Sequence, residues 1–133
     1  MKNDKTDNHE QIFWEEIDRL FPDMIKAIAS LSKKSYLSIT NLRTGITWWS
    51  ERAMDYFGMK ENYTIRSMEK ANRKIHPDDV ATFKRGFKER VDGKNLDTAW
   101  EYRIQDGDSY NRFNAMARVL YDEQKQPFII IIR

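Results

Sequence analysis

The 133-residue sequence contains no cysteine, only three prolines and five glycines, and no long hydrophobic run. Without cysteine the chain has no disulfides, thiolate metal ligands, iron–sulfur clusters or thiol nucleophiles, and this composition suits a reducing cytosol, so we expect a cytoplasmic protein. The longest aliphatic run, Ile129 to Ile132, is far shorter than the roughly 20 apolar residues that cross a bilayer. The residues after Met1 do not form the apolar core of a signal peptide. We therefore expect no membrane insertion.

The charges are almost balanced, with 23 Lys and Arg residues against 21 Asp and Glu residues and a net charge of +2. Such a balance describes a mixed, solvated surface and does not require a polyanionic partner, so we expect no nucleic acid. The length allows one domain with one core. The five glycines are isolated from one another, so the chain has no glycine-rich phosphate-binding loop.

The N-terminal part of the chain divides into a polar segment and an amphipathic one. Residues 1–8 show no apolar periodicity and predict a disordered lead-in. In residues 9–33 apolar side chains recur every three or four positions, which predicts helix, and Pro22 divides it into two helices in series. We expect the apolar side to pair with the same helices of a second subunit or to pack on an exposed sheet face, in preference to a purely intramolecular lid. The candidate residues of this interface are Phe13, Ile17, Leu20, Phe21, Met24 and Ile28.

Residues 36–58 predict a β-hairpin followed by a short helix. Residues 36–40 and 46–49 have the alternation and the β-branched and aromatic composition of strands. Ser50 can cap the following helix with its hydroxyl group, and Gly58 can end it in the left-handed conformation. Residues 59–75 have few apolar anchors, so they predict short helical turns and loop.

A longer helix is predicted to begin at Pro77 and to end near Gly93. Proline fits the first helical turn, and Asp78 and Asp79 complement the positive end of the helix dipole. His76 precedes the proline and fits a capping role. The apolar residues at helical spacing are Val80, Phe83, Phe87 and Val91.

The last third of the sequence predicts three strands, at residues 100–104, 110–120 and 128–132. The first two are joined by a turn at Gly107, and the third is apolar on both faces. Together with the hairpin they predict an α+β fold, in which helices pack on one face of a five-stranded antiparallel sheet.

Several short motifs occur in a characteristic order. They are Trp49-Ser50, Tyr56-Phe57-Gly58, Ile75-His76-Pro77-Asp78-Asp79, Glu101-Tyr102-Arg103-Ile104 with Asp106-Gly107 and Phe113, and Ala117-Arg118-Val119 with Asp122 and Pro127. This series resembles the PAS family, in the subgroup whose helix opens with His-Pro-Asp-Asp, over residues 36–133. Residues 38–45 leading into Trp49-Ser50 look like the sensory PAS modules that precede diguanylate cyclase or related output domains in bacterial signalling proteins.

The resemblance implies a regulatory input domain without enzymatic activity. It implies a sheet and a helical cap around a small interior, homodimerisation through flanking helices and the sheet face, and an attached output domain, which this chain lacks. A ligand or a partner contact would transmit a signal only by favouring one of two packings of the helices. The ligand-pocket candidates are Leu37, Ile39, Trp48, Met54, Phe57, Phe83, Phe87, Tyr102, Phe113 and Ala115.

The sequence also departs from parts of the family pattern. Relatives that form a photoadduct with flavin need a cysteine, so cysteinyl-flavin photochemistry is excluded. Phe113 stands where the family usually has tryptophan, which preserves aromatic bulk. The cofactor stays unknown, and neither haem nor flavin is favoured. His76 is in principle a haem ligand, but its place before Pro77 favours capping. His9 and His76 are far apart in the sequence, so no metal site is predicted.

Two other functions stay open at this stage. The first is a small α+β enzyme with a hydrophobic substrate cavity, in which His76 or a buried carboxylate acts as the base. The carboxylates of Asp78 and Asp79 diverge on a first helical turn, so they do not favour a paired acid/base site. The second is a sheet that stacks single-stranded nucleic acid. Its aromatic candidates are Trp48, Trp49, Trp100, Tyr102, Tyr110 and Phe113, interleaved with Arg103, Arg112 and Arg118.

Overall fold

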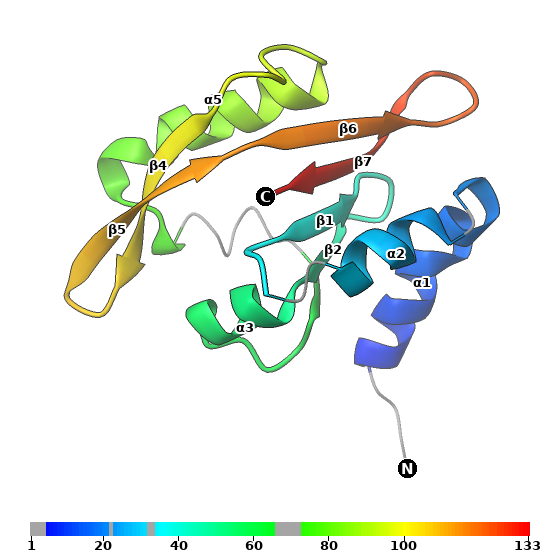
Figure 1. Cartoon of the computed structure of the whole chain (residues 1–133), viewed down its shortest axis with the longest axis horizontal. Helices are drawn as coiled ribbons and strands as arrows, with labels where there is room; N and C mark the ends of the chain where they lie inside the picture. The colour runs from blue at the N-terminus through cyan, green and yellow to red at the C-terminus, as the bar shows by residue number, and fades with distance from the viewer. Residues whose placement is uncertain (1–4, 22, 32–33, 66–72) are drawn as a thin grey trace.

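The computed structural model of the chain describes residues 5–21, 23–31, 34–65 and 73–133. The elements, in order, are α1 (Lys5–Leu20), α2 (Met24–Leu31), β1 (Ser38–Asn41), β2 (Ile46–Trp49), α3 (Glu51–Phe57), β3 (Tyr63–Ile65), the 3₁₀ turn η1 (Pro77–Asp79), α5 (Val80–Val91), β4 (Trp100–Asp106), β5 (Ser109–Ala115), β6 (Ala117–Tyr121) and β7 (Pro127–Ile132) (Figure 1). In this part of the chain no helix is long and apolar enough to span a bilayer.

The predicted fold class is confirmed, because five strands form an antiparallel sheet in the order β3-β2-β1-β7-β6. The membership of the sheet differs from the prediction. The strand expected over residues 110–120 divides at Met116 into β5 and β6, which run end to end in Figure 1. As a result β4 pairs with β5 in a separate two-stranded ladder, which touches residue Ile75 through a single bridge to Ile104.

The fifth strand of the sheet, β3, lies in the segment that was predicted to be turns and loop. That prediction is wrong for residues 63–65, and the reason is a contact between distant parts of the chain. Tyr63 packs against the ring of Phe13 on α1 at 5.5 Å and accepts a hydrogen bond of 2.7 Å from the indole of Trp14. Local sequence patterns carry no information about such a contact. Met68, a further apolar residue of the segment 59–75, lies outside the described residues.

The strands β1 and β2 present two chemically different faces. Because side chains alternate along a strand, Ile39 and Trp48, which pair across the ladder, share one face, and Thr40 and Thr47 share the other. The first face joins the buried cluster beneath α1. The second face carries hydroxyl groups and points toward α5.

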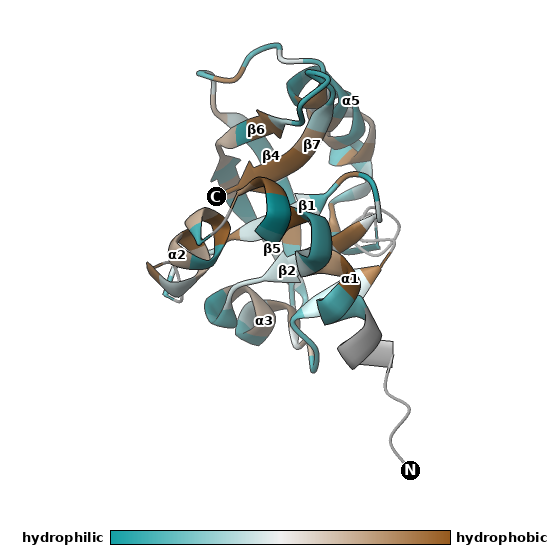
Figure 2. Ribbon diagram, turned by 90° about the vertical axis from the view of Figure 1, so that its right-hand side faces the viewer, coloured by the Kyte–Doolittle hydropathy of each residue, from teal (hydrophilic) through white to brown (hydrophobic). Residues whose placement is uncertain are grey.

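The strand β7 is apolar on both faces because both faces are covered. Ile129 and Ile131 join the cluster beneath α1 and α2, whereas Ile130 and Ile132 pack on the side of α5. Figure 2 shows β7 as one of the most hydrophobic segments of the ribbon. The predicted apolar character of residues 128–132 is therefore explained by a central position in the sheet, between β1 and β6.

The N-terminal helices cover the face of their own sheet that lies opposite α5. Phe13 and Ile17 are fully buried within the single chain, and Asn41 on β1 donates a side-chain hydrogen bond to the carbonyl of Phe13. These two residues are therefore part of the intramolecular core and are not available to a second subunit. Three other interface candidates, Leu20, Phe21 and Ile28, pack against the same cluster, whereas Met24 remains 41% exposed.

The boundaries of the N-terminal helices differ slightly from the predicted ones. The first helix begins at Lys5, so residues 5–8 are helical, whereas residues 1–4 of the predicted lead-in lie outside the described residues. As predicted, two helices follow one another, with Asp23 in the left-handed region between them at a φ of 65°. Pro22, which was expected to cause the break, is not among the described residues.

Ionic contacts fasten the C-terminal half of α1 to two turns of the sheet. The guanidinium of Arg43, in the β1–β2 turn, bonds to the carboxylates of Glu16 on α1 and Asp122 after β6. It also lies 4.8 Å over the ring of Phe128. The Asp122 carboxylate accepts backbone hydrogen bonds from Gln124 and Gln126, and the second of these is the main reason why its pKa is lowered. One arginine thus joins a helix and both turns at this end of the sheet.

The helix α5 approaches β4 very closely at Gly86. A β-carbon added at this position would lie 2.4 Å from the indole nitrogen of Trp100 and within 2.9 Å of two of its ring carbons. Glycine is unfavourable in the middle of a helix, so its presence here is explained by the contact. The predicted helix over 77–92 is present, with a 3₁₀ first turn.

We expect Gly86→Ala to lower the free energy of unfolding by about 1–3 kcal/mol, because the indole of Trp100 has to move out of the core to admit a methyl group. Urea unfolding followed by circular dichroism measures this change. Arg85→Ala is the matched control, since Arg85 is exposed on the same helix. If Gly86→Ala instead raised the free energy of unfolding, by the amount that alanine usually gains over glycine inside a helix, the contact with Trp100 would not be tight.

Candidate functional site

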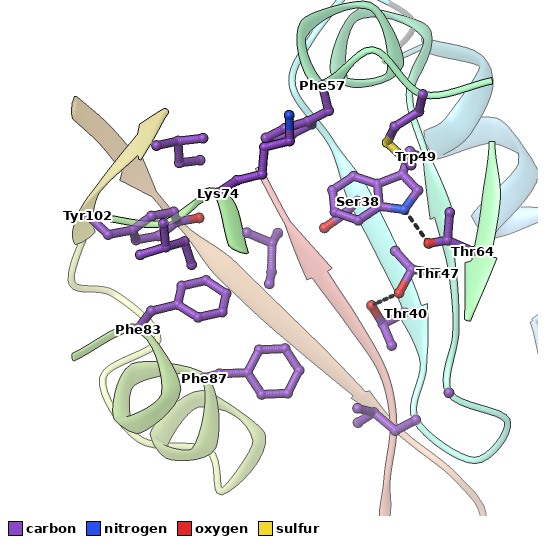
Figure 3. Close-up of a pocket in the computed structure, with 16 residues that line it drawn as sticks. Ser38, Thr40, Thr47, Trp49, Phe57, Thr64, Lys74, Phe83, Phe87 and Tyr102 are labelled. Carbon is purple, nitrogen blue, oxygen red and sulfur yellow. Dashed lines mark hydrogen bonds between the residues drawn. The ribbon is translucent and has the colours of Figure 1, made fainter. Parts of the chain in front are cut away.

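A cavity of about 450 Å³ lies between the hydroxyl-bearing face of the sheet, the end of α3, helix α5 and strand β4 (Figure 3). The sheet supplies its floor through β1, β2, β3 and β7, and the segment just before η1 supplies part of its rim. The residues that line it are Ser38, Thr40, Leu42, Gly45, Thr47, Trp49, Phe57, Met59, Thr64, Lys74, Ile75, Phe83, Phe87, Tyr102, Ile104 and Ile132.

Two groups of aromatic rings form opposite walls of the cavity. On one side the rings of Trp49 and Phe57 meet edge to face, with centroids 5.8 Å apart. On the other side Phe83 lies 4.9 Å from Tyr102 and 6.5 Å from Phe87. Figure 3 shows these two groups facing each other across the open space. Such walls favour an apolar, flat occupant.

The floor of the cavity carries four hydroxyl side chains, and three of them form hydrogen bonds to other lining residues. Thr40 and Thr47 share a hydrogen bond of 2.8 Å, and Thr64 accepts one of 2.7 Å from the indole of Trp49. The fourth hydroxyl, on Ser38, has no hydrogen-bond partner among the described residues, and the same holds for the phenol of Tyr102 on the opposite wall.

Burial determines the protonation state of Tyr102. Its side chain is almost completely enclosed, and this desolvation raises the pKa of the phenol well above its ordinary value of 10.0, despite the opposing effect of Arg90. The phenol is therefore protonated at neutral pH and can donate a hydrogen bond into the cavity.

Local capping interactions hold the elements around the cavity in place. Ser50 accepts a hydrogen bond of 3.3 Å from the amide of Ala53 and another from Leu37, and Gly58 ends α3 at a φ of 64°. Both residues act as the sequence predicts. Gly107 likewise takes a positive φ, of 62°, in the turn between β4 and β5.

His76 caps η1 and lies outside the cavity. Its Nδ1 accepts a hydrogen bond of 3.1 Å from the amide of Asp78, Pro77 follows it at the first position, and its ring lies 4.6 Å from that of Tyr110. This placement supports the predicted capping role and does not fit a haem ligand or a general base in the cavity. Among the described residues no group of three metal-ligating side chains occurs.

The two aspartates of this turn have different roles. Asp78 is exposed, whereas Asp79 accepts hydrogen bonds from both Nε and Nη2 of Arg103, at 2.8 and 3.0 Å, and from its backbone amide at 2.9 Å. The guanidinium lowers the pKa of the Asp79 carboxyl to about 2. This forked ion pair fixes the start of α5 to β4 beside the cavity, in addition to the predicted effect of the carboxylate on the helix dipole.

Comparison with known proteins identifies the family. The family profile described as "PAS fold" matches residues 46–132, which is well over half of the chain. The chain belongs to the PAS family. No functionally curated protein matches this PAS domain.

Solved structures show the same fold at low sequence identity. A sensory box histidine kinase/response regulator from Burkholderia thailandensis has a TM-score of 0.56 at 17% identity, over 80% of this chain and 79% of that one. The N-terminal domain of a diguanylate cyclase with PAS/PAC sensor from Marinobacter aquaeolei has a TM-score of 0.58 at 16% identity, over 72% and 88%. A PAS domain of a Colwellia psychrerythraea protein has a TM-score of 0.51 at 19% sequence identity, over 84% of this chain and 96% of that one.

The structure brings some of the pocket candidates to the cavity of the PAS domain and turns others away. Phe57, Phe83, Phe87 and Tyr102 line it. Three others lie on the opposite face of the sheet in the cluster beneath α1, namely Leu37, Ile39 and Trp48. Their assignment to the pocket was wrong because α1 covers the more apolar face of the hairpin, which leaves the hydroxyl-bearing face to line the cavity.

The remaining candidates also lie away from the cavity. Met54 is half-buried on α3, Phe113 packs between Tyr36 and Tyr56, and Ala115 pairs with Trp100 in the ladder of β4 and β5. The lining residues that the sequence analysis missed include Ser38, Thr40, Thr47, Trp49 and Lys74. The signal for the first four was present, since they form the second face of the alternating hairpin.

The aromatic residues proposed for nucleic-acid stacking do not form one surface of this PAS domain. Trp48 and Trp49 point to opposite faces of β2, and Trp100 and Tyr102 are buried against Phe83. The interleaved arginines form ion pairs within the chain, Arg103 with Asp79, Arg112 with Glu101 and Arg118 with Asp97. The structure therefore does not support the single-strand binding platform.

We expect the stabilising effect of Asp79 to depend on pH in a defined direction. Because its pKa in the folded protein, about 2, lies below the ordinary value of 3.8, its contribution is fully present above about pH 5 and is lost as the pH falls from about 4 toward 2. The difference in unfolding free energy between the parent protein and Asp79→Asn should therefore be constant from about pH 5 to 7 and shrink below about pH 4. Urea titrations at pH 3 to 7 measure it.

The control for this experiment is Asp78→Asn, which changes a neighbouring exposed carboxylate that does not pair with Arg103. It should show little change in stability over the same pH range. If the difference in unfolding free energy between the parent protein and Asp79→Asn stayed the same from pH 7 down to pH 3, the Asp79 carboxylate would not be held by Arg103.

Proposed function

We propose that this PAS domain is a sensory module that binds a small ligand in its cavity and passes the signal to an attached output domain. The observation that carries the proposal is the position of the cavity. Its floor is formed by β1 and β2, and the opposite face of the same two strands holds α1. A ligand that alters the packing of these strands therefore acts on α1 without any intervening element.

The proposed mechanism requires two arrangements of α1 on the sheet. A ligand can shift the balance between them only if it binds one arrangement more tightly than the other. The contacts that would differ are the apolar ones of Phe13 and Ile17 and the ionic ones of Glu16 with Arg43. The proposal does not involve a haem held by His76, which lies outside the cavity, or a flavin bound covalently to cysteine, which the chain lacks.

The output domain in this proposal is of the diguanylate cyclase kind and the setting is the cytoplasm. The sequence resemblance to input modules of such proteins supports it, as does the likeness to a solved domain described as part of a diguanylate cyclase. The chain itself has a non-catalytic role in this proposal, in keeping with the general character of PAS domains as sensors.

We expect purified protein to bind small apolar or amphipathic compounds in the cavity. Native mass spectrometry should detect a bound compound, and at a concentration about 100 times the Kd it should stabilise the protein by about 2.7 kcal/mol. Ile104→Phe, which adds volume inside the cavity, should abolish both effects. Leu120→Phe is the control, because Leu120 is a half-buried residue of β6 outside the cavity. No bound mass, together with no stabilising compound in a broad screen, would contradict the sensory proposal.

We also propose that the module forms a homodimer through the exposed parts of α1 and α2. Ile12, Met24 and Leu31 are large apolar residues that remain 44%, 41% and 87% exposed. We expect Leu31→Glu to shift the protein toward the monomer, because a buried, unpaired charge opposes association. Light scattering at several protein concentrations measures the mass. Ser30→Glu, an exposed position one residue away, should leave it unchanged, and a monomeric mass for the parent protein would end this part of the proposal.

A further inference from the structure

Three polar groups of the cavity have no partner in the part of the chain that the structure describes. They are the hydroxyls of Ser38 and Tyr102 and the ammonium group of Lys74. As whole residues Ser38 and Tyr102 are only 9% and 8% exposed, and Figure 3 shows both hydroxyl oxygens pointing into the open space from opposite sides. Because no described residue uses these groups as partners, all three are free to bond to an occupant of the cavity.

The charge of the cavity indicates the charge of the occupant. Lys74 is the one charged side chain among the described lining residues, and Figure 3 shows it at the upper edge beside Phe57. The nearby carboxylate of Asp79 is already paired with Arg103 and does not line the cavity. An anionic group at the rim therefore gains an ion pair with Lys74, whereas a cationic group gains none.

The hydroxyl groups indicate the polarity of the buried end of the occupant. The phenol of Tyr102 stays protonated and donates, and the Ser38 hydroxyl can donate or accept. Both can therefore donate a hydrogen bond to an oxygen atom of the occupant. Between this end and the rim, the space is bounded by the rings of Trp49 and Phe57 on one wall and of Phe83 on the other.

We infer that the ligand of this PAS domain is an aromatic carboxylate that carries a second oxygen substituent. Its carboxylate pairs with Lys74 at the rim, its ring lies between the two aromatic walls, and its second oxygen accepts hydrogen bonds from Ser38 and Tyr102. The cavity volume of about 450 Å³ accommodates a ligand of one or two fused rings. This inference rests on the proposed sensory function and specifies the ligand of the same site.

The test for the carboxylate uses 6-hydroxy-2-naphthoate and its neutral amide as probes in isothermal titration calorimetry. The parent protein should bind the carboxylate about 5–10 times more tightly than the amide, as expected for a partly exposed charge-assisted hydrogen bond. Lys74→Met should remove this preference and leave the affinity for the amide unchanged. Lys84→Met is the control, because it removes the same charge from an exposed position of α5 outside the cavity, and it should retain the preference.

The test for the buried oxygen compares 6-hydroxy-2-naphthoate with 2-naphthoate, which lacks the hydroxyl group. Tyr102→Phe should weaken binding of the first probe about 5–10-fold and leave the second unchanged, because it removes one donor and keeps the ring. Without ligand the same variant should be as stable as the parent protein or more stable, since its hydroxyl has no partner among the described residues. Ser38→Ala should act in the same way. A loss of stability in the ligand-free variants would show that these hydroxyls serve the fold and would overturn their role in binding.

The outcomes separate this inference from the sensory proposal on which it rests. Equal affinities for the carboxylate and the amide, or a preference that survives Lys74→Met, would overturn the aromatic carboxylate and leave a neutral ligand in the cavity. Failure of all three probes to bind would also overturn it. Native mass spectrometry of the parent protein would then decide whether the cavity binds any small molecule.

Discussion

The structure depends on the division of β1 and β2 into one apolar face and one hydroxyl-bearing face. Ile39 and Trp48 need a cover, and α1 supplies it with Phe13 and Ile17. Because this face is closed, the face with Ser38, Thr40 and Thr47 becomes the floor of the interior on the side of α5. Small polar side chains on that floor do not fill the space beneath the aromatic rings. The cavity is thus a consequence of how the hairpin distributes its side chains.

The helix α5 closes the other side of this space, and two unusual contacts hold it against Trp100 on β4. Gly86 allows the backbone to lie against Trp100, and Arg90, which is 3% exposed, donates hydrogen bonds to the carbonyls of Gly86 and Thr98 and lies over the same indole ring. A buried arginine held by carbonyl groups and an aromatic face is rigid, because its donors have a fixed planar arrangement. Phe83 and Phe87 are therefore presented to the cavity from a firmly held helix.

Much of the fold could be predicted from the sequence because its signals are local. Ser50, Gly58 and Pro77 act within a few residues of themselves, and periodicity alone indicates the helices and the apolar strand β7. The interior could not be predicted in the same way. Whether Leu37 or Ser38 faces the cavity depends on which side of the sheet α1 covers, and β3 exists because Tyr63 meets α1. Those are contacts between residues far apart in the sequence, and no local pattern encodes them.

The attachment of α1 combines two kinds of contact that respond differently to the solution. Phe13 and Ile17 hold the helix through buried apolar contacts, and between them Glu16 bonds to Arg43, which also bonds to the carboxylate of Asp122. Dissolved salt weakens attraction between partly exposed charges but leaves apolar burial intact or strengthens it. A rise in ionic strength would therefore weaken the ionic junction at Arg43 while the apolar contacts of Phe13 and Ile17 keep α1 docked, so salt acts on one kind of contact and leaves the other in place.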